Sequence, residues 1–130
     1  MSTKSSQLGK DGENVACEYL VQKGFQIIER NARKPWGEID IVAKAPDKTL
    51  VFVEVKTMRK YTGGLSPEDQ MTRDKVKKFK RAASLYAGSN GSLVNDNRGW
   101  RLDLLAITVK NNNLTDKKNT FIIRHYKNIF

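Results

Sequence analysis

The 130 residues of this chain suffice for one domain, which would bury roughly two thirds of the surface of the unfolded chain. The formal net charge of +10 favours a polyanionic partner, either nucleic acid or an anionic membrane surface. With one cysteine, Cys17, and one histidine, His125, the sequence excludes an intrachain disulfide and argues against an ordinary four-ligand zinc site. Any bound metal must therefore be held by oxygen atoms.

No apolar run in the sequence approaches the ~20 residues needed to cross a bilayer. The start of the chain is polar and lacks the apolar core of a signal peptide. We therefore expect a cytoplasmic protein without a membrane partner. It should fold as a single domain over residues 1–130, with a polar leader over residues 1–7.

The first predicted element is a helix over residues 8–23, which ends at Gly24. One face of this helix is small and apolar except for Glu13. The other members of that face are Gly9, Gly12, Ala16 and Leu20. Because small residues let a helix approach a sheet closely, Glu13 would be carried toward the sheet. Alternatively, Glu13 turns to water at the edge of the face, or it is an N-terminal acid that favours the helix dipole.

Residues 25–30 predict a first strand, and residues 31–37 predict a basic connection to the next one. The connection contains Arg33 and Lys34, which are candidate contacts for nucleic acid, and Trp36. The indole could contact nucleic acid, or it could pin the loop by packing against the protein. The sequence favours neither alternative.

Two apolar runs, residues 38–43 and 50–57, flank a turn signal at residues 46–48 and predict an antiparallel hairpin. If the turn consists of those three residues, the numbers of facing residues sum to 94, which places Asp40 opposite Glu54. Facing residues, and residues two apart on one strand, point to the same side of a sheet. Four charged side chains would then form one patch: Glu38, Asp40, Glu54 and Lys56. A register slip of one residue would separate them.

The chemistry of this patch points to a metal. Two carboxylates about 5 Å apart repel by roughly 3 kcal/mol at an effective dielectric constant near 20, and one ammonium offsets only part of that repulsion. The missing partner would be a divalent cation, since carboxylate oxygens and water are the ligands that Mg²⁺ or Mn²⁺ prefers. A neighbouring lysine can orient a water or stabilise charge on a phosphate, which is the chemistry of phosphodiester hydrolysis.

The alternative is that Glu54 and Lys56 form a solvated pair at a strand end while Asp40 faces water. An isolated Glu-x-Lys pattern is short and common, and by itself it favours that alternative. Here the strand over residues 50–57 is apolar on both sides before its charges begin. Buried charges need compensation, so this context favours the site.

Residues 66–87 predict a second helix, with Ser66 as its cap, Pro67 in its first turn and Gly88 at its end. Its buried stripe would consist of Thr72, Val76, Phe79, Ala83 and Tyr86. Basic residues occupy both flanks, with Arg73, Lys77, Lys80 and Arg81 on one and Lys75 and Lys78 on the other. A charge run on a helix is usually a solvated face. Beside a nuclease-like hairpin, these side chains are candidate phosphate contacts.

The C-terminal part predicts a flexible loop over residues 89–99 and two further strands, residues 100–110 and 121–126, joined by a turn over residues 111–119.

Two side chains of these last strands need a separate interpretation. Asp103 could be another acid of the site, but we expect it to pair with Arg101 or Arg124. His125 is expected to pack or to form a hydrogen bond rather than to catalyse.

The order helix, three strands, helix, strand and a final strand, together with these acids and the lysine, resembles the PD-(D/E)xK nuclease superfamily. More closely, the chain resembles the YraN-like family of small bacterial proteins, which is related to archaeal Holliday junction resolvases. The likeness covers nearly the whole chain and rests on Gly12-Glu13 with Ala16 and Tyr19-Leu20, Gly24-Phe25, Asn31-x-Arg33, Gly37-Glu38-Ile39-Asp40, Phe52-Val53-Glu54-Val55-Lys56 and Arg101-Leu102-Asp103. It implies an α/β fold with a restriction-endonuclease-like core, in which a mixed central sheet is flanked by helices.

The resemblance also implies roles for residues at matching positions. Asp40 and Glu54 would bind the metal, Lys56 would be the catalytic lysine, and Glu13 would be an accessory acid from the first helix. Glu38 is a further accessory candidate.

We therefore expect a Mg²⁺- or Mn²⁺-dependent endonuclease that hydrolyses phosphodiester bonds in DNA, with branched repair or recombination intermediates as candidate substrates. Relatives that cut both strands symmetrically often work as dimers, which makes a homodimer a candidate assembly. Two alternatives stay open. One is a non-catalytic nucleic-acid-binding module that retains the nuclease fold, and the other is a basic interaction protein on ribosomes or membranes. The two acids and the lysine favour the enzyme.

Overall fold

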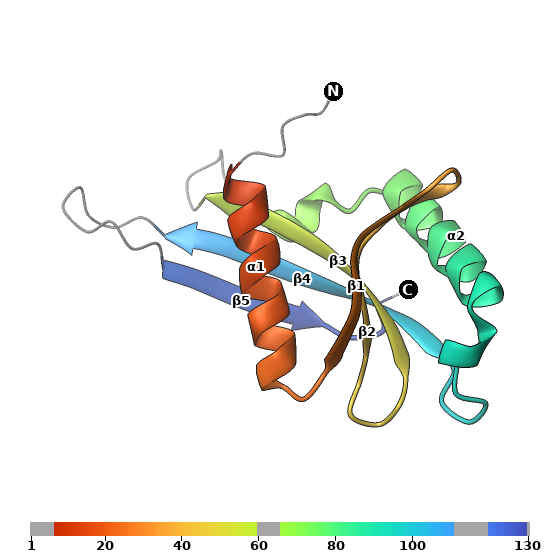
Figure 1. Cartoon of the computed structure of the whole chain (residues 1–130). Coiled ribbons are helices and arrows are strands. Elements are labelled where there is room, and N and C mark those ends of the chain that lie inside the picture. Colours follow the sequence, from red (N-terminus) through yellow and green to blue (C-terminus); the bar gives the residue numbers. More distant parts are fainter. Residues whose placement is uncertain (1–6, 60–65, 111–119, 130) are drawn as a thin grey trace.

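The computed structural model describes residues 7–59, 66–110 and 120–129. Within these ranges, two α-helices pack against a five-stranded mixed sheet (Figure 1). The elements in chain order are α1 (Gln7–Gln22), β1 (Gln26–Lys34), β2 (Gly37–Lys44), β3 (Leu50–Arg59), α2 (Arg73–Ser89), β4 (Trp100–Lys110) and β5 (Thr120–Tyr126). The predicted α/β class and the predicted order of elements are confirmed.

The strands lie in the sheet in the same order as in the chain, from β1 to β5. Neighbouring strands are antiparallel except for β3 and β4, which are parallel. A parallel pair needs a crossover connection, and α2 is the helix of that crossover. The three antiparallel pairs are formed by strands that follow one another directly in the chain.

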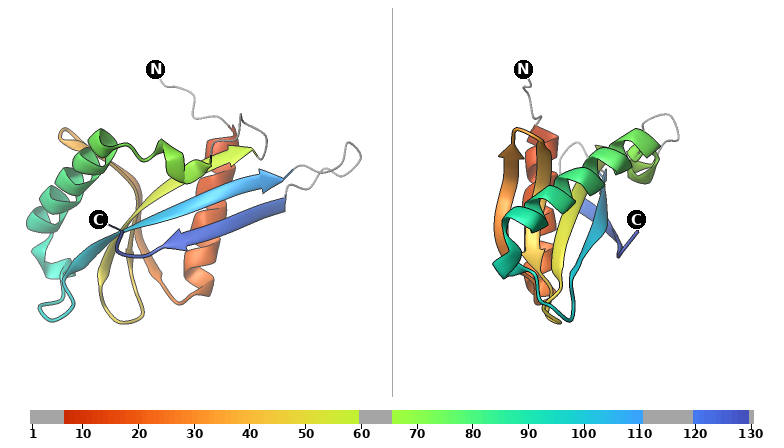
Figure 2. Two further views of the ribbon diagram at one scale, coloured as in Figure 1. Left: turned by 180° about the vertical axis from the view of Figure 1, so that it is seen from behind. Right: turned by 90° about the vertical axis from the view of Figure 1, so that its right-hand side faces the viewer.

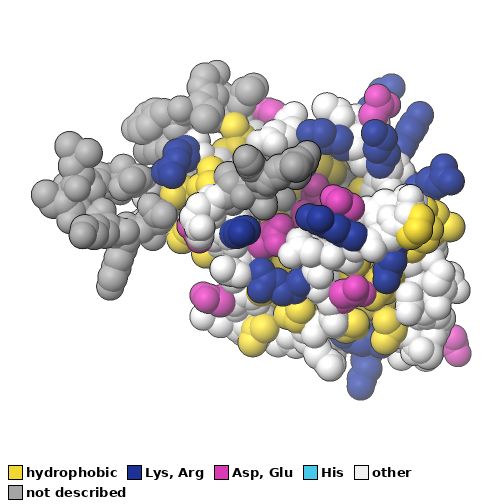
Figure 3. Space-filling view, turned by 45° about the horizontal axis from the view of Figure 1, so that its top comes forward, with side chains coloured by type: hydrophobic (Ala, Val, Ile, Leu, Met, Phe, Trp, Pro, Cys, Tyr) yellow, Lys and Arg dark blue, Asp and Glu magenta, His cyan; other side chains and the backbone are white. Residues whose placement is uncertain are grey.

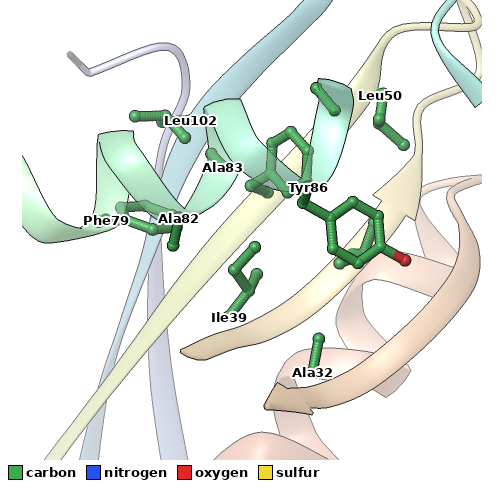
Figure 4. Packing of buried hydrophobic residues seen from close by; sticks show 11 residues of the cluster. Ala32, Ile39, Leu50, Phe79, Ala82, Ala83, Tyr86 and Leu102 are labelled. Carbon is green, nitrogen blue, oxygen red and sulfur yellow. The ribbon is translucent and has the colours of Figure 1, made fainter. Parts of the chain in front are cut away.

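The two helices cover opposite faces of the sheet (Figure 2). Alternate residues of β3 show this most clearly, because Leu50 and Phe52 pack with α2 whereas Val51 and Val53 pack with α1. Figure 4 shows the α2 side, where Phe79 and the small residues that follow it lie over the sheet. Burying each large apolar side chain contributes roughly 1.5–3 kcal/mol, so the central strands are the most firmly held part of the sheet.

The small face of α1 allows the close approach that the sequence predicts. A Cβ atom on Gly12 would lie 2.0 Å from Thr57 Oγ1 of β3, so no side chain fits at this position. Helix α1 then ends as predicted before Gly24, whose φ of +90° favours glycine.

The prediction for residues 25–37 was wrong in extent. Strand β1 continues to Lys34 and pairs with β2 through the register Ala32–Ile39 and Lys34–Gly37, so the connection is a tight turn at Pro35 and Trp36. The error has a physical reason, because β1 is an edge strand and most of its side chains are polar and exposed. The Trp36 indole is half-buried and packs against the α2-side core, as one of the two alternatives proposed.

The second helix was predicted to begin too early. Ser66 caps a short 3₁₀-helix, Pro67–Gln70, and the Asp69 carboxylate accepts a hydrogen bond from the Ser66 N–H at 2.9 Å. Helix α2 begins afterwards with Thr72 as its N-cap, whose hydroxyl accepts from the Lys75 N–H. Thr72 is therefore exposed instead of part of the buried stripe, which consists of Phe79, Ala82, Ala83, Tyr86 and Ala87.

Residues 89–99, predicted as a loop, contain a second 3₁₀-helix, Gly91–Leu93, and a bridge between Asn95 and Gly99. Leu93 and Val94 pack against the α2-side core. Residues 1–6 of the leader predicted over 1–7 and the turn at 111–119 lie outside the described residues, and Gln7 is the first residue of α1. Neither α1 nor α2 is long and apolar enough to span a bilayer.

Candidate functional site

The predicted hairpin register is the one that the structure has. Strands β2 and β3 pair from Lys44–Leu50 to Ile41–Val53. Asp40 and Glu54 are the next residues after the last of these pairs. There the Asp40 side chain reaches β3 instead, and its Oδ2 accepts a hydrogen bond from the Val55 N–H at 2.8 Å.

Glu54 and Lys56 form an ion pair next to Asp40. Lys56 Nζ lies 3.0 Å from Glu54 Oε2, and the two side chains are only 18% and 19% exposed. The alternative of a freely solvated pair at a strand end therefore does not describe these two residues. The ammonium is held by one carboxylate while the other carboxylate lies on the adjacent strand.

Glu38 has an ion-pair partner of its own. It was predicted opposite Lys56, but at this point β2 pairs with β1, and Glu38 faces Arg33. Arg33 Nε lies 3.5 Å from Glu38 Oε1, and both side chains are mostly exposed. An exposed pair of this kind contributes little to stability.

The electrostatic strain at Asp40 is large. Burial and the neighbouring Glu54 carboxylate raise the pKa of Asp40 to about 7, and Glu13 adds to this rise. The Val55 N–H and the Lys56 ammonium lower the pKa of Asp40, but they do not compensate. Carboxyl groups with strongly shifted pKa values are typical of functional sites.

Two cavities meet at these side chains, and Glu38, Asp40, Glu54 and Lys56 line both of them. One, of about 490 Å³, opens on the side of α2, and the other, of about 350 Å³, opens on the side of α1. Figure 3 shows acidic side chains grouped near the centre of one face, with lysine and arginine side chains around them. The end of the β2–β3 pairing thus creates a notch between the two helices that is lined by charge.

Helix α2 contributes three cations to the α2-side cavity: Lys75, Lys78 and Arg81. Arg81 was predicted to share a flank with Arg73, Lys77 and Lys80, but those three residues do not line the cavity and are exposed elsewhere on the helix. Trp36, in the turn between β1 and β2, lines the same cavity as the three cations. The sequence did not predict this arrangement, since helix and turn are far apart in the chain.

Glu13 lies on the other side of the site. It lines the α1-side cavity with Leu8 and Gly9, and Gly12 holds this part of α1 close to β3. Glu13 is half-buried and near enough to contribute to the raised pKa of Asp40. The expectation that α1 carries Glu13 toward the hairpin agrees with this position.

The donor set fits a hard divalent cation with two protein carboxylates. Within residues 7–59, 66–110 and 120–129, no group of three or more Asp, Glu, His or Cys side chains is close enough to hold a metal. Asp40 and Glu54 would therefore share the cation with water molecules. Mg²⁺ keeps several waters and is commonly held by one or two carboxylates, so this donor set suits it.

A second charged cluster was predicted only in part, through the Arg101–Asp103 pair and a hydrogen bond of His125. The Asp103 carboxylate is 0% exposed and accepts hydrogen bonds from Arg101 Nε at 3.0 Å and from the Asn128 N–H at 2.9 Å. His125 Nε2 lies 2.8 Å from the other Asp103 oxygen, and Tyr19 Oη lies 3.0 Å from His125 Nδ1. The expected Arg101 pair is confirmed, whereas Arg124 lies 3.5 Å from Glu68. The signal that could have identified the cluster is a charged Arg-x-Asp at the start of an otherwise apolar strand.

Burial and bonding act in opposite directions on Asp103. Burial by itself would raise the pKa of this carboxyl group, but the hydrogen bonds from His125, Arg101 and Asn128 outweigh it and hold the pKa below its usual range. Asp103 is therefore a compensated acid and lies outside both cavities of the hairpin site.

Fold and site together define a small α/β protein with a carboxylate–lysine site on its central hairpin and a row of cations beside it. The family model described as "Uncharacterised protein family UPF0102" matches residues 12–107. The chain therefore belongs to the UPF0102 family, the YraN-like proteins. The match includes most of α1, the hairpin, all of α2 and most of β4.

Similar UPF0102 proteins occur in several organisms. The protein of Lawsonia intracellularis is 40% identical over 98% of this chain and 87% of its own length. That of Campylobacter concisus is 40% identical over 87% of this chain and 92% of its own. That of Desulfosudis oleivorans is 38% identical over 93% of this chain and 94% of its own.

Proposed function

We propose that this protein is a metal-dependent nuclease that hydrolyses phosphodiester bonds in DNA at the Asp40–Glu54–Lys56 site. One observation carries the proposal. Two carboxylates on adjacent strands meet where the strands separate, one of them has a pKa raised to about 7, and a lysine held by the other lies beside them. Carboxyl groups whose pKa is raised by burial and by a neighbouring carboxylate are concentrated at functional sites.

The residues of the chain have distinct proposed roles. The Val55 N–H fixes one oxygen of Asp40, so this carboxylate has a defined orientation toward a cation. Glu54 would supply the second set of oxygens and also holds Lys56 in place. The Lys56 ammonium would orient the attacking water or stabilise the charge that grows on the phosphate. Glu13, from the α1 side, would adjust the charge of the site.

A divalent cation bound there would polarise the phosphate and lower the pKa of a bound water. The resemblance to the PD-(D/E)xK superfamily supports the same assignment, because the acid on β2 and the Glu-x-Lys on β3 stand at the positions of its motif. Helix order and sheet topology are compatible with this core. Homodimer formation, expected for relatives that cut two strands, belongs to the same proposal.

The row of cations on α2 supports a nucleic-acid substrate. Lys75, Lys78 and Arg81 line the cavity that contains the acids, so a backbone bound along them would place a phosphate near Lys56. Arg33 and Lys34 at the end of β1 are further candidate contacts, although Arg33 is already paired with Glu38.

The test of catalysis is incubation of the tag-free protein with linear, nicked, flapped and four-way DNA, single-stranded DNA and RNA, with Mg²⁺, with Mn²⁺ or with chelator. We expect a metal-dependent product on at least one substrate. Lys56→Ala and Asp40→Ala should each slow cleavage by roughly 10²- to 10³-fold or more, and the double variant should be hardly worse, because the residues act as one unit.

Lys44→Ala is the matched control for catalysis. Lys44 lies at the other end of β2 and lines neither cavity of the site. This variant should cleave at the rate of the unmodified protein. Cleavage that survives Lys56→Ala would contradict the proposed mechanism.

The test of the cation row is the salt dependence of duplex DNA affinity. Replacing Lys75, Lys78 and Arg81 by Gln should reduce the slope of log affinity against log salt by about 2 to 3. Replacing Arg73, Lys77 and Lys80 by Gln removes the same charge from the other side of α2 and should change the slope less. Equal effects of the two triple variants would mean that the basic helix acts only through its total charge.

A second candidate function has its own support. Lys75, Lys78 and Arg81 line one cavity, and these cations by themselves support a non-catalytic nucleic-acid-binding module that retains the fold. Salt-dependent DNA binding through the α2 row, without a metal-dependent product from any substrate, would identify this alternative.

A further inference from the structure

A third cavity, of about 330 Å³, lies at the end of α1 opposite Glu13. It is lined by the C-terminal part of α1, the β2–β3 turn and the ends of β4 and β5. Its polar lining consists of Tyr19, Lys23, Asp47, Arg101, His125 and Lys127. Lys23 directly follows α1, whose last residue, Gln22, is nine positions after Glu13, which corresponds to about 14 Å along the helix axis. The cavity is therefore separate from the hairpin site, and we call it the Tyr19 cavity.

The charge of the Tyr19 cavity favours an anion. Lys23, Arg101 and Lys127 contribute three positive charges to the lining. Two negative charges oppose them, one from the exposed Asp47 of the lining and one from the buried Asp103 next to it. Lys23 Nζ lies 5.8 Å from the centre of the Tyr19 ring, so this cation is held near the tyrosine. Hydrogen bonds from the side chain and the backbone of Thr49 lower the pKa of Asp47, and Arg98 and Arg101 lower it further, so Arg98 is a fourth cation near the cavity.

The polar groups of the cavity wall are held in fixed positions. Asp103 binds Arg101 through two hydrogen bonds, from Nε to Oδ1 and from the terminal nitrogen to Oδ2. A guanidinium has five N–H donors, so several remain for a second acceptor. The His125 side chain is 6% exposed and lies between Asp103 and Tyr19. Preorganised donors of this kind cost little ordering entropy when a ligand binds.

The chemistry of Tyr19 favours binding over covalent catalysis. Burial and the Asp103 carboxylate raise the pKa of Tyr19, so its hydroxyl stays protonated and is a poor nucleophile. A protonated hydroxyl is instead a hydrogen-bond donor for an anionic oxygen.

His125 is in hydrogen-bond contact with both Tyr19 and Asp103. Its Nδ1 lies 3.0 Å from Tyr19 Oη, and its Nε2 lies 2.8 Å from Asp103 Oδ2, which can only accept. A ligand that binds the Tyr19 hydroxyl therefore changes the surroundings of the His125 ring.

We propose that the Tyr19 cavity is a second binding site, which takes a phosphate group through the Tyr19 hydroxyl, Arg101, Lys23 and Lys127. The phosphate can belong to a small phosphorylated compound or to a nucleic-acid backbone, and the recognised chemistry is the same. A volume near the lower end of the ~300–1,000 Å³ of ligand pockets suits a group of this size. The site does not depend on the nuclease activity proposed above.

His125 offers a direct readout, because it is the only histidine in the sequence. The ¹⁵N resonances of its ring in a tag-free sample report the surroundings of both nitrogens. Titration with inorganic phosphate at constant ionic strength and neutral pH should shift the Nδ1 resonance until the site is saturated, because Nδ1 contacts the Tyr19 hydroxyl. Chloride at the same ionic strength should leave it in place.

Variants test whether the binding groups are those named. Tyr19→Phe keeps the ring and removes the hydroxyl, and it should weaken phosphate affinity by roughly tenfold. Lys23→Gln and Lys127→Gln should each weaken it by roughly 3- to 10-fold. Lys10→Gln is the matched control, because Lys10 is exposed on α1 and lines none of the three cavities. Its affinity for phosphate should be unchanged.

A second titration identifies the source of the phosphate. If duplex DNA moves the His125 resonances at a lower phosphate concentration than inorganic phosphate does, the ligand is a nucleic-acid backbone. If inorganic phosphate alone moves them, the ligand is a small phosphorylated compound. Ring resonances that are indifferent to both, or that respond equally in a Tyr19→Phe/Lys127→Gln variant with an unchanged melting temperature, would overturn the proposal.

Discussion

Asp40 and Asp103 both lie on strands and are flanked by apolar residues in the sequence, yet their surroundings in the folded protein are opposite. Asp103 is fully buried and accepts from Arg101, His125 and Asn128, and its pKa is lowered. Asp40 accepts one backbone hydrogen bond, faces Glu54, and has its pKa raised to about 7. The fold supplies the Asp103 carboxylate with hydrogen-bond donors and positive charge, whereas the Asp40 carboxylate is still repelled by Glu54.

The difference shows that burial of an acid does not by itself identify a functional site. What matters is whether the protein supplies the charge and the hydrogen bonds that burial removes. Asp103 receives them and so can anchor two other side chains at the edge of a second cavity. Asp40 lacks a full set, which leaves a place for a cation.

The largest expected effect comes from Asp103→Asn. The change removes a charge that compensates Arg101 and leaves part of the network without its acceptor, so we expect a loss of roughly 3–5 kcal/mol in the free energy of unfolding at neutral pH. Chemical denaturation checks this value. Because the pKa of Asp103 is lowered in the folded protein, the loss should shrink as the pH falls through that lowered pKa. A variant as stable as its parent would mean that the network contributes nothing.

The same substitution at the other aspartate should have the opposite sign. Asn at position 40 can still accept from the Val55 N–H while the repulsion with Glu54 disappears, so Asp40→Asn should stabilise the metal-free protein by roughly 1–3 kcal/mol at pH 8. Denaturation of both proteins between pH 4 and pH 8 measures this gain.

The pH dependence of the gain follows from the direction of the pKa shift. The pKa of Asp40 rises from 3.8 to about 7 on folding, so the folded protein loses stability as the pH increases through this interval. The advantage of Asp40→Asn should be absent near the lower value and reach a plateau above the upper one. An advantage that is equal at all pH values would contradict the raised pKa.

The smallest expected effect is the stabilisation of the folded protein by a bound metal ion. If Asp40 and Glu54 hold a divalent cation, Mg²⁺ or Mn²⁺ at ten times its dissociation constant should stabilise the folded protein by about 1.4 kcal/mol, seen as a higher melting temperature. Asp40→Asn should lose most of this rise. Glu38→Gln should keep it, because Glu38 lines the same cavities but is paired with Arg33. Equal rises in all three proteins would place the cation elsewhere.

Much of the candidate site could be predicted because its determinants are local. The turn between β2 and β3 sets the register of the hairpin, and a period of two residues then decides which side chains share a face. Asp40, Glu54 and Lys56 lie within a short stretch of chain, so their proximity follows from that register. The small face of α1 similarly predicted a close approach to the sheet, which Gly12 makes possible.

Local sequence patterns were ambiguous where the same residues are compatible with two backbone structures. Ser66 was recognised as a cap, but Thr72 provides a second cap, and the backbone forms a 3₁₀-helix before α2 begins. The exposed side chains of β1 look like those of a loop, since an edge strand needs few buried residues.

What the sequence by itself determined is therefore the order of elements, the hairpin register and the set of acids and lysine on it, since each depends on neighbours in the chain. Only the tertiary structure decided which cations lie near the acids and which aspartate has its buried charge compensated by hydrogen bonds. Tyr19 and His125 are 106 positions apart, and no periodicity of a single element brings them together. Their contact depends on how α1 packs across β4 and β5, and such packing is a sum of many small apolar contacts that no short motif encodes.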